Sequence, residues 1–138
     1  MVGSIATVTP ELYHQVIELN LFGPLHAIQA VVPVMKEQGG GVIINISSSV
    51  SKMAIPGLGA YASTKYALNG LSLTAHNELV ADNSRVVLCL PGQTATDFGK
   101  NALRDESMQG WRPPSDRPVP QTDTAEDVAR RILEAAIN

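Results

Sequence analysis

Cysteine is almost absent from this sequence of 138 residues: Cys89 stands alone in the apolar run VVLCLP, so the chain cannot form an internal disulfide. This usage is typical of a reducing compartment, and a thiol in such a run is more often buried and structural than reactive. The N-terminus also lacks the basic start and apolar core of a signal peptide, and we expect no apolar run of membrane-spanning length. We therefore expect a cytoplasmic protein with no membrane partner.

The sequence also lacks a strong excess of charge of either sign. The net charge is −3, with no block of like charges and no basic stripe, which argues against nucleic acid as a partner. His14, His26 and His76 are scattered, without Cys, Asp or Glu at ligand spacing, so we expect no metal site. What is present is an apolar content of 44% in a chain of one domain's length, typical of a globular protein.

Two apolar runs predict buried strands. GVIINIS (41–47) and RVVLCL (85–90) contain few polar residues and do not alternate, which favours strands covered on both faces of a parallel sheet. Apolar residues at helical spacing predict long helices over 11–37, with a bend near Gly23-Pro24, and over 60–81. A last helix is predicted from Thr124, which has Asp127 as its capping-box partner.

This order of helices and strands indicates an α/β fold with a parallel sheet. Two strands with apolar faces on both sides do not make an independently stable sheet, so we expect residues 1–138 to be a single partial domain from a larger open sheet. Residues 93–121, which include Trp111, are irregular in sequence and are predicted to form a long loop, which is either a lid over a substrate or a partly disordered segment.

The stretch GAYASTKYALNG (59–70) places Tyr61 four residues before Lys65, so both side chains lie on one face of a helix. Taken alone, the pair also fits an ordinary helix surface. However, the strand 41–47 runs into three serines, at the edge of a parallel sheet where ligands bind. An ammonium lowers the pKa of a neighbouring phenol, and a hydroxyl opposite it could hold a carbonyl oxygen. These parts suit the reduction of a carbonyl by hydride transfer.

The run GVIINISSSVSKMAIPGLGAYASTKYAL resembles the catalytic segment of the short-chain dehydrogenase/reductase family, in its shorter, single-domain branch. ELNLFG resembles the segment that bears a fourth catalytic residue, and LPGQTAT resembles the proline-glycine motif after the sixth strand. The matches follow the family's order across nearly the whole chain. The resemblance implies a partial Rossmann-like fold, a doubly wound parallel sheet that lacks its N-terminal strands.

The resemblance also implies a catalytic site. In it Tyr61 is the general acid/base, Lys65 lowers the pKa of Tyr61 and binds the nicotinamide ribose, and Ser48 orients the substrate oxygen. Asn20 holds a water that links Lys65 to solvent. The cofactor is NAD or NADP, and the residues implied at its nicotinamide end are Tyr61, Lys65, Pro91, Gly92, Thr94 and Thr96.

Several parts of the family pattern are absent: the glycine-rich dinucleotide fingerprint, the residue that selects NAD or NADP, and the Asn-Asn-Ala-Gly motif. The resemblance therefore covers the catalytic half. It implies an oxidoreductase for a small alcohol or carbonyl substrate that forms a homo-oligomer through the helices 11–37 and 60–81. The alternative is a truncated, non-catalytic relative that acts as an interaction module through the same helices.

Overall fold

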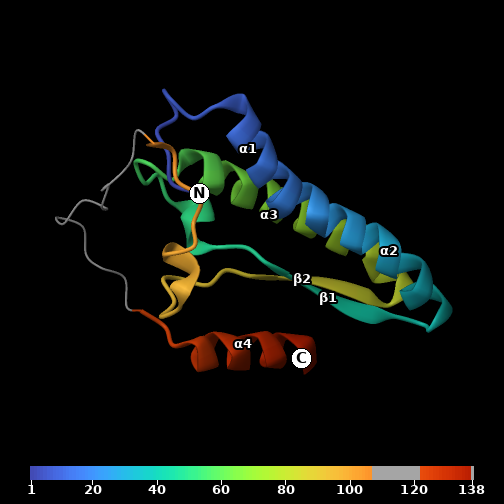
Figure 1. Cartoon of the computed structure of the whole chain (residues 1–138). Helices are drawn as coiled ribbons and strands as arrows, with labels where there is room; N and C mark the ends of the chain where they lie inside the picture. The colour runs from blue at the N-terminus through green and yellow to red at the C-terminus, as the bar shows by residue number, and fades with distance from the viewer. Residues whose placement is uncertain (107–121, 138) are drawn as a thin grey trace.

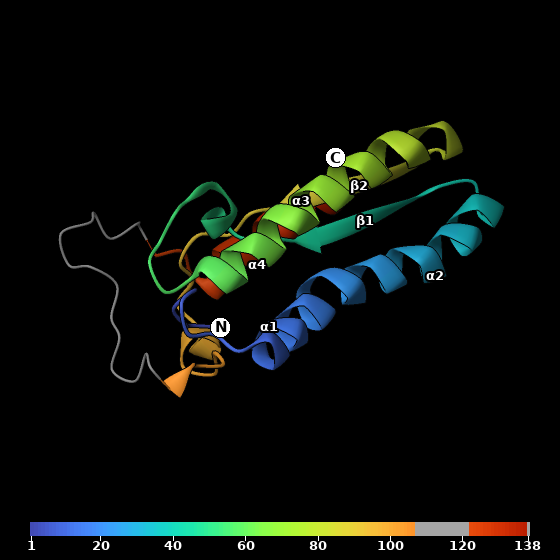
Figure 2. The same ribbon diagram turned by 90° about the horizontal axis from the view of Figure 1, so that it is seen from above.

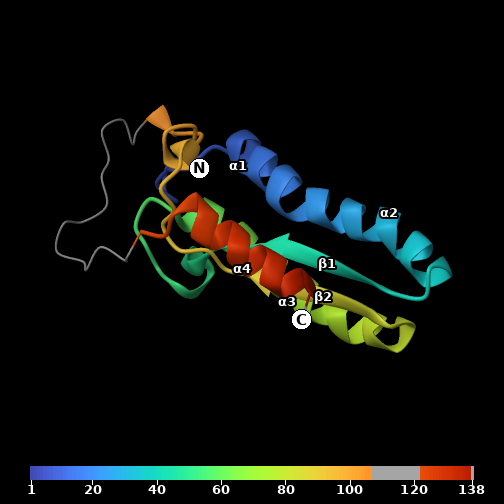
Figure 3. The ribbon, with the colours of Figure 1, turned by 90° about the horizontal axis from the view of Figure 1, so that it is seen from below.

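The computed structural model describes residues 1–106 and 122–137. They form three layers, in which a pair of strands lies between two layers of helix (Figure 1). The helices and strands are α1 (Pro10–Ile17), α2 (Gly23–Glu37), β1 (Gly41–Ile46), α3 (Gly59–Leu79), β2 (Ser84–Cys89) and α4 (Ala125–Ile137). α1, α2 and α3 lie on one face of the strands and α4 lies on the other (Figures 1 and 3). This is the α/β arrangement that the sequence predicts.

The two strands pair in parallel, from Gly41 opposite Ser84 to Ile46 opposite Cys89. Both begin and end within one residue of the predicted ranges. The pairing continues beyond the strands, because the Ser47 N–H donates to the Cys89 carbonyl at 2.8 Å and the Ser49 N–H donates to the Pro91 carbonyl at 2.9 Å. The loops that follow β1 and β2 are thus held side by side at the carboxyl edge of the sheet, where ligands bind in open parallel sheets.

The long N-terminal helix contains an irregular turn that the sequence did not predict. Between α1 and α2, residues Glu18–Phe22 form a π-turn, and the Gly23 N–H reaches back to the Glu18 carbonyl. The bend was expected at Gly23-Pro24, but the irregularity lies just before it, and Pro24 falls in the first turn of α2. Because the helix continues through this point, Pro24 removes one backbone hydrogen bond, and the irregular turn before it accommodates the loss.

The expectation that no apolar run reaches membrane-spanning length is wrong for this element. Together, α1, the π-turn and α2 form a helix of 28 residues, Pro10–Glu37, that by length and composition could cross a membrane and is mostly exposed. This is weak evidence, since core helices of soluble proteins meet the same criterion. In Figure 2 the helix runs beside α3 and along β1, so one of its sides is packed within the described chain.

The C-terminal helix begins as predicted. The Thr124 hydroxyl donates to Asp127 Oδ2 at 2.9 Å, and the Asp127 N–H donates to Thr124 Oγ1 at 3.1 Å, which completes the N-terminal cap of α4. Most of the predicted substrate loop, residues 107–121 with Trp111, lies outside the described residues.

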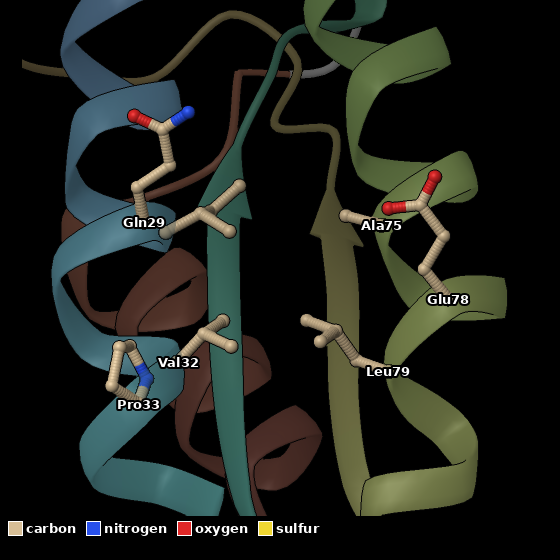
Figure 4. A pocket seen from close by; sticks show the side chains of 7 residues that line it. Gln29, Val32, Pro33, Ala75, Glu78 and Leu79 are labelled. Atoms are coloured by element: carbon tan, nitrogen blue, oxygen red, sulfur yellow. The ribbon is translucent and has the colours of Figure 1, made fainter.

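A groove of about 310 Å³ lies between α2 and α3 above the strands. Its lining is mainly apolar: Ile28, Gln29, Val32, Pro33, Ala75, Glu78 and Leu79. Val32 and Leu79 extend over the strands from the two helices (Figure 4). Ala75 lies fourteen positions after Tyr61 on α3, roughly 21 Å along the helix axis, so this groove is separate from the candidate catalytic residues.

Candidate active site

Ser48 and Tyr61 meet where β1 ends and α3 begins. Ser48 follows β1 in an extended conformation and caps the short turn Ser49–Lys52, in which the Val50 N–H donates to Ser48 Oγ at 3.3 Å. The Ser48 hydroxyl also lies near enough to the Tyr61 phenol to lower its pKa. The structure therefore brings together the two residues that the sequence places thirteen positions apart.

Lys65 lies one turn after Tyr61 on α3. Its Nζ is 5.9 Å from the centroid of the Tyr61 ring, within the range of a cation–π contact, and donates to the Ile46 carbonyl at 3.0 Å. An ammonium has three N–H donors, and in the described part of the chain the Ile46 carbonyl takes one of them. The other two suit the hydroxyls of a ribose.

The pKa values of this pair are governed mainly by burial. Loss of hydration raises the pKa of the Tyr61 phenol above its ordinary value, and the hydrogen bond with Ser48 lowers it only in part. Burial also lowers the pKa of Lys65. The pKa of Tyr61 is therefore raised and not lowered as expected, because desolvation of the phenolate has the largest effect. At neutral pH Tyr61 carries its proton and can donate it.

Asn20 lies in the π-turn and is joined to the site through a third residue. Its Nδ2 donates to Thr64 Oγ1 at 3.2 Å, and the Thr64 hydroxyl donates to the Tyr61 carbonyl at 2.8 Å. Thr64 is almost fully buried, so both of its bonds are shielded from water. The Asn20 side chain thus holds the backbone of Tyr61, while its predicted partner Lys65 bonds to Ile46. π-turns are frequent at functional sites.

The loop predicted to bind the cofactor follows β2 and is fixed at both ends. At its start, Pro91 accepts the bond from Ser49, directly after Ser48. Further on, Thr94 pairs with Asp123: the Ala95 N–H donates to the Asp123 carbonyl at 3.0 Å, and the Asp123 N–H donates to the Gln93 carbonyl at 2.9 Å. The segment before α4 therefore supports this loop from outside.

The end of the same loop reaches Tyr61. Thr96 Oγ1 accepts from the Phe98 N–H at 3.4 Å and caps the short turn Asp97–Gly99. The Phe98 ring lies 6.1 Å from the Tyr61 ring, measured between centroids, in a tilted arrangement. The predicted proton donor and the predicted cofactor loop are thus neighbours in space.

Two residues beside the site were not predicted, Phe98 and Asn69. Asn69 follows Lys65 by four residues and hydrogen-bonds the serines around Ser48. The spacing that pairs Tyr61 with Lys65 could have extended to Asn69, since residues one turn apart share a helix face. Phe98 lies in an irregular segment, where no periodic pattern points to it.

Comparison with known proteins identifies the family. The family model for short chain dehydrogenases matches residues 1–107. The chain belongs to the short-chain dehydrogenase family. A 3alpha-hydroxysteroid dehydrogenase from Mediterraneibacter gnavus is 43% identical over 89 residues, which are 64% of this chain and 36% of that protein. Human dehydrogenase/reductase SDR family member 4 is 35% identical over 107 residues, 78% of this chain and 38% of that protein.

Solved structures of proteins related to this chain share its fold. A 7 alpha-hydroxysteroid dehydrogenase complexed with NADH and 7-oxo glycochenodeoxycholic acid superposes with a TM-score of 0.81 and 27% identity, over 99% of this chain and 52% of that one. A short-chain dehydrogenase from Streptomyces avermitilis matches with a TM-score of 0.81 and 26% identity, over the same two shares. The resemblance in sequence and the partial Rossmann-like fold are confirmed, and the chain spans about half the length of the solved relatives it matches.

Proposed function

We propose that this short-chain dehydrogenase chain is the catalytic part of an NAD(P)-dependent oxidoreductase that interconverts an alcohol and a ketone or aldehyde. The observation that carries the proposal is that Ser48 and Lys65 both lie beside Tyr61: the serine hydroxyl lowers the pKa of the phenol, and the Lys65 ammonium lies over the same ring. The three groups gather at the carboxyl edge of a parallel sheet, the usual ligand edge of such folds. Relatives named hydroxysteroid dehydrogenases support a carbonyl or alcohol as the substrate.

Each side chain has a task in this chemistry. Tyr61, kept protonated at neutral pH by burial, gives its proton to the carbonyl oxygen during reduction, and Ser48 donates a second hydrogen bond to the same oxygen. In oxidation the phenolate takes the proton of the alcohol. A bound NAD(H) or NADP(H) supplies or accepts the hydride. Asn20, fixed through Thr64, keeps Tyr61 in place and belongs to the proposed water relay to Lys65.

The residues present fit the nicotinamide end of the cofactor. Lys65 keeps N–H donors for the ribose, and Thr94 and Thr96 lie in the loop beside Tyr61. At Gly92 an added Cβ would come no closer than 3.9 Å to Asp123, its nearest neighbour, so the backbone there is open to a ligand. The glycine-rich turn that receives the pyrophosphate in dinucleotide-binding folds is not in this sequence.

We therefore expect the chain of 138 residues alone to bind NADH and NADPH weakly or not at all. The measurement is a titration followed by nucleotide fluorescence, with the Lys65→Met variant as its control. Saturable micromolar binding that Lys65→Met abolishes would contradict this expectation, and would mean that the catalytic half holds the dinucleotide by itself. The oxidoreductase proposal itself is tested by turnover of ketones with either nucleotide, using the longest in-frame product of the coding region.

We also propose that the chain forms a homo-oligomer through its long helices. Tyr66, Leu73 and Val80 are exposed on α3 and its terminal turn at intervals of seven residues, the spacing of a helix–helix seam. On the neighbouring long helix, Val31 and Val34 are exposed as well. Exposed apolar side chains gathered on neighbouring helices are typical of a protein–protein interface. The same surface would serve the interaction module that is the second candidate function, which predicts association without turnover.

A substitution at the centre of this seam tests the oligomer. Leu73→Arg is expected to convert the oligomer to a monomer, because it places a charge in the apolar contact, and light scattering after gel filtration measures the mass. Leu133→Arg on α4 is the matched control, since Leu73 and Leu133 are 60% and 63% exposed. A loss of association in both variants, or in neither, would contradict an interface at α3.

A further inference from the structure

A chain of hydrogen bonds links the loop that carries Ser48 to α3. Its side chains are separate from the group formed by Ser48, Tyr61 and Lys65. The Ser47 hydroxyl donates to Asn69 Oδ1 at 2.6 Å, with the Lys65 carbonyl as a weaker acceptor at 3.3 Å. Asn69 Nδ2 then donates to Ser51 Oγ at 2.8 Å, and the Ser51 hydroxyl donates to the Ser48 carbonyl at 2.7 Å. Asn69 thus holds the residues on both sides of Ser48.

The direction of this chain is fixed by the chemistry of its members. Each serine hydroxyl has one hydrogen, and Ser51 uses its hydrogen on the Ser48 carbonyl, so Ser51 Oγ can only accept from Asn69. An amide supplies both the acceptor and the donor that the two serines require. Ser47 and Ser51 are 4% and 2% exposed, so water does not readily replace a bond that is lost.

Asn69 is placed for this task by its position on α3. It lies one turn after Lys65 and two turns after Tyr61, so all three side chains share one face of the helix toward the end of β1. Tyr61 and Lys65 approach Ser48 and Ile46 from this face, and Asn69 fixes the loop that carries Ser48 to the same helix. The distance between the hydroxyls of Ser48 and Tyr61 is therefore set by one rigid element.

We propose that Asn69 is a positioning residue, which acts through Ser51 to hold Ser48 against Tyr61. The inference rests on the oxidoreductase proposal for its effect on turnover, but the placement of Ser48 can be tested without turnover. Asn69 touches neither Tyr61 nor the reacting atoms in this role. Its removal loosens the turn Ser49–Lys52 and lets the Ser48 hydroxyl move away from the phenol.

The chain offers a closely matched control for Ser51 in Ser72, which lies on α3 and bonds to β1. Ser72 is 1% exposed, accepts from Asn45 Nδ2 at 2.8 Å and donates to the Leu68 carbonyl at 2.7 Å. Ser51 makes the same two kinds of bond, at the same two distances, with Asn69 and Ser48. Ser51→Ala and Ser72→Ala therefore remove the same chemistry at the same depth, and only the first removes a bond to Ser48.

The test compares Asn69→Ala, Ser51→Ala and Ser72→Ala in the full chain. The pKa of Tyr61 is followed by NMR with tyrosine labelled at Cζ, and the Tyr61→Phe variant assigns its signal among the three tyrosines. Titratable Lys65 faces the ring from α3 and stays unchanged in all variants. Because Ser48 lowers the pKa of Tyr61, Asn69→Ala and Ser51→Ala should raise it as far as Ser48→Ala does, and Ser72→Ala should leave it unchanged.

Two further readouts separate positioning from general stability. Amide exchange at Ser51 and Met53, whose N–H groups bond within the turn, should speed up in the Asn69 and Ser51 variants while exchange in β1 stays slow. In the longest in-frame product, kcat should fall about tenfold to a hundredfold, as expected for a misplaced group, and the Asn69/Ser51 double variant should fall no further than either single one.

Equal shifts of the Tyr61 pKa in the Asn69 and Ser72 variants, or no shift in either, would overturn the proposal. If Ser51→Ala does not fold, Ser51→Cys keeps the volume with a weaker donor and is judged by the same pKa shift. Absence of turnover in every variant and in the parent, combined with the expected pKa shifts, would remove the oxidoreductase proposal and leave the positioning role of Asn69 standing.

Discussion

Replacing Tyr61 by Phe is expected to lower kcat by about 10²–10⁴-fold, the usual effect of removing a general acid/base. The ring itself is retained, so its packing against the buried cluster of Met1, Val16 and Ala60 and its contact with Phe98 persist. The change removes only the hydroxyl that carries the proton and bonds to Ser48. Turnover of a panel of ketones with NADH and NADPH, in the longest in-frame product of the coding region, measures the effect.

Tyr13→Phe is the matched control for this prediction. It also deletes a phenolic hydroxyl that makes a hydrogen bond, to Ser63 Oγ at 2.7 Å, only two residues from Tyr61 on α3. Its kcat should stay within about twofold of the parent value, because the effect of a lost hydrogen bond on stability, about 1 kcal/mol, does not act on the reacting oxygen. A Tyr61→Phe variant as active as the Tyr13→Phe variant would refute the proposed mechanism.

Ser48→Ala should lower kcat by about 10²–10³-fold and also change the pH profile. Without Ser48 the Tyr61 phenolate loses a donor, so the pKa of Tyr61 rises further above its ordinary value. Reduction requires the protonated phenol, and the rate falls as pH passes this pKa. The alkaline limb of kcat/KM for carbonyl reduction should therefore move to higher pH in the variant, while the plateau falls.

The neighbouring Ser49→Ala variant serves as the control for the pH profile. The contact of Ser49 with Pro91 runs through its backbone N–H, which alanine retains. The plateau and the alkaline limb should both stay where they are in the parent. A limb that moves to lower pH in Ser48→Ala, or moves equally in Ser49→Ala, would mean that Ser48 does not act on Tyr61.

The strands and most helix ends could be predicted from local sequence. The runs around Ile43 and Val87 are apolar and β-branched without alternation, which favours a strand covered on both faces, and both strands are found within a residue of their predicted ends, although Val42 and Ile46 remain exposed. The cap of α4 was also predictable from local sequence, because the Thr124 hydroxyl accepts from the Asp127 N–H and donates to the Asp127 carboxylate, three residues away.

The features that were missed depend on tertiary contacts. Pro24 signals a bend, but the position of the extra residue is tied to the bond between Asn20 and Thr64, 44 positions apart in sequence. Sequence spacing placed the ammonium of Lys65 near Tyr61 and so predicted a lowered pKa for the phenol. The sign depends instead on how far the ring is removed from water, which no sequence pattern reports.

The π-turn at Glu18–Phe22 has a consequence for how this helix tolerates change. A π-turn accommodates one residue more than an α-helical turn, so deleting a single residue there would restore a regular α-helix and change the directions of the side chains within the turn. The regular helix would gain ordinary backbone hydrogen bonds. However, Asn20 would face away from Thr64, and the hydrogen bonds that link Asn20 to the Tyr61 backbone through Thr64 would be lost. The irregular turn is therefore needed for the contact that positions Tyr61, and a regular helix would not provide it.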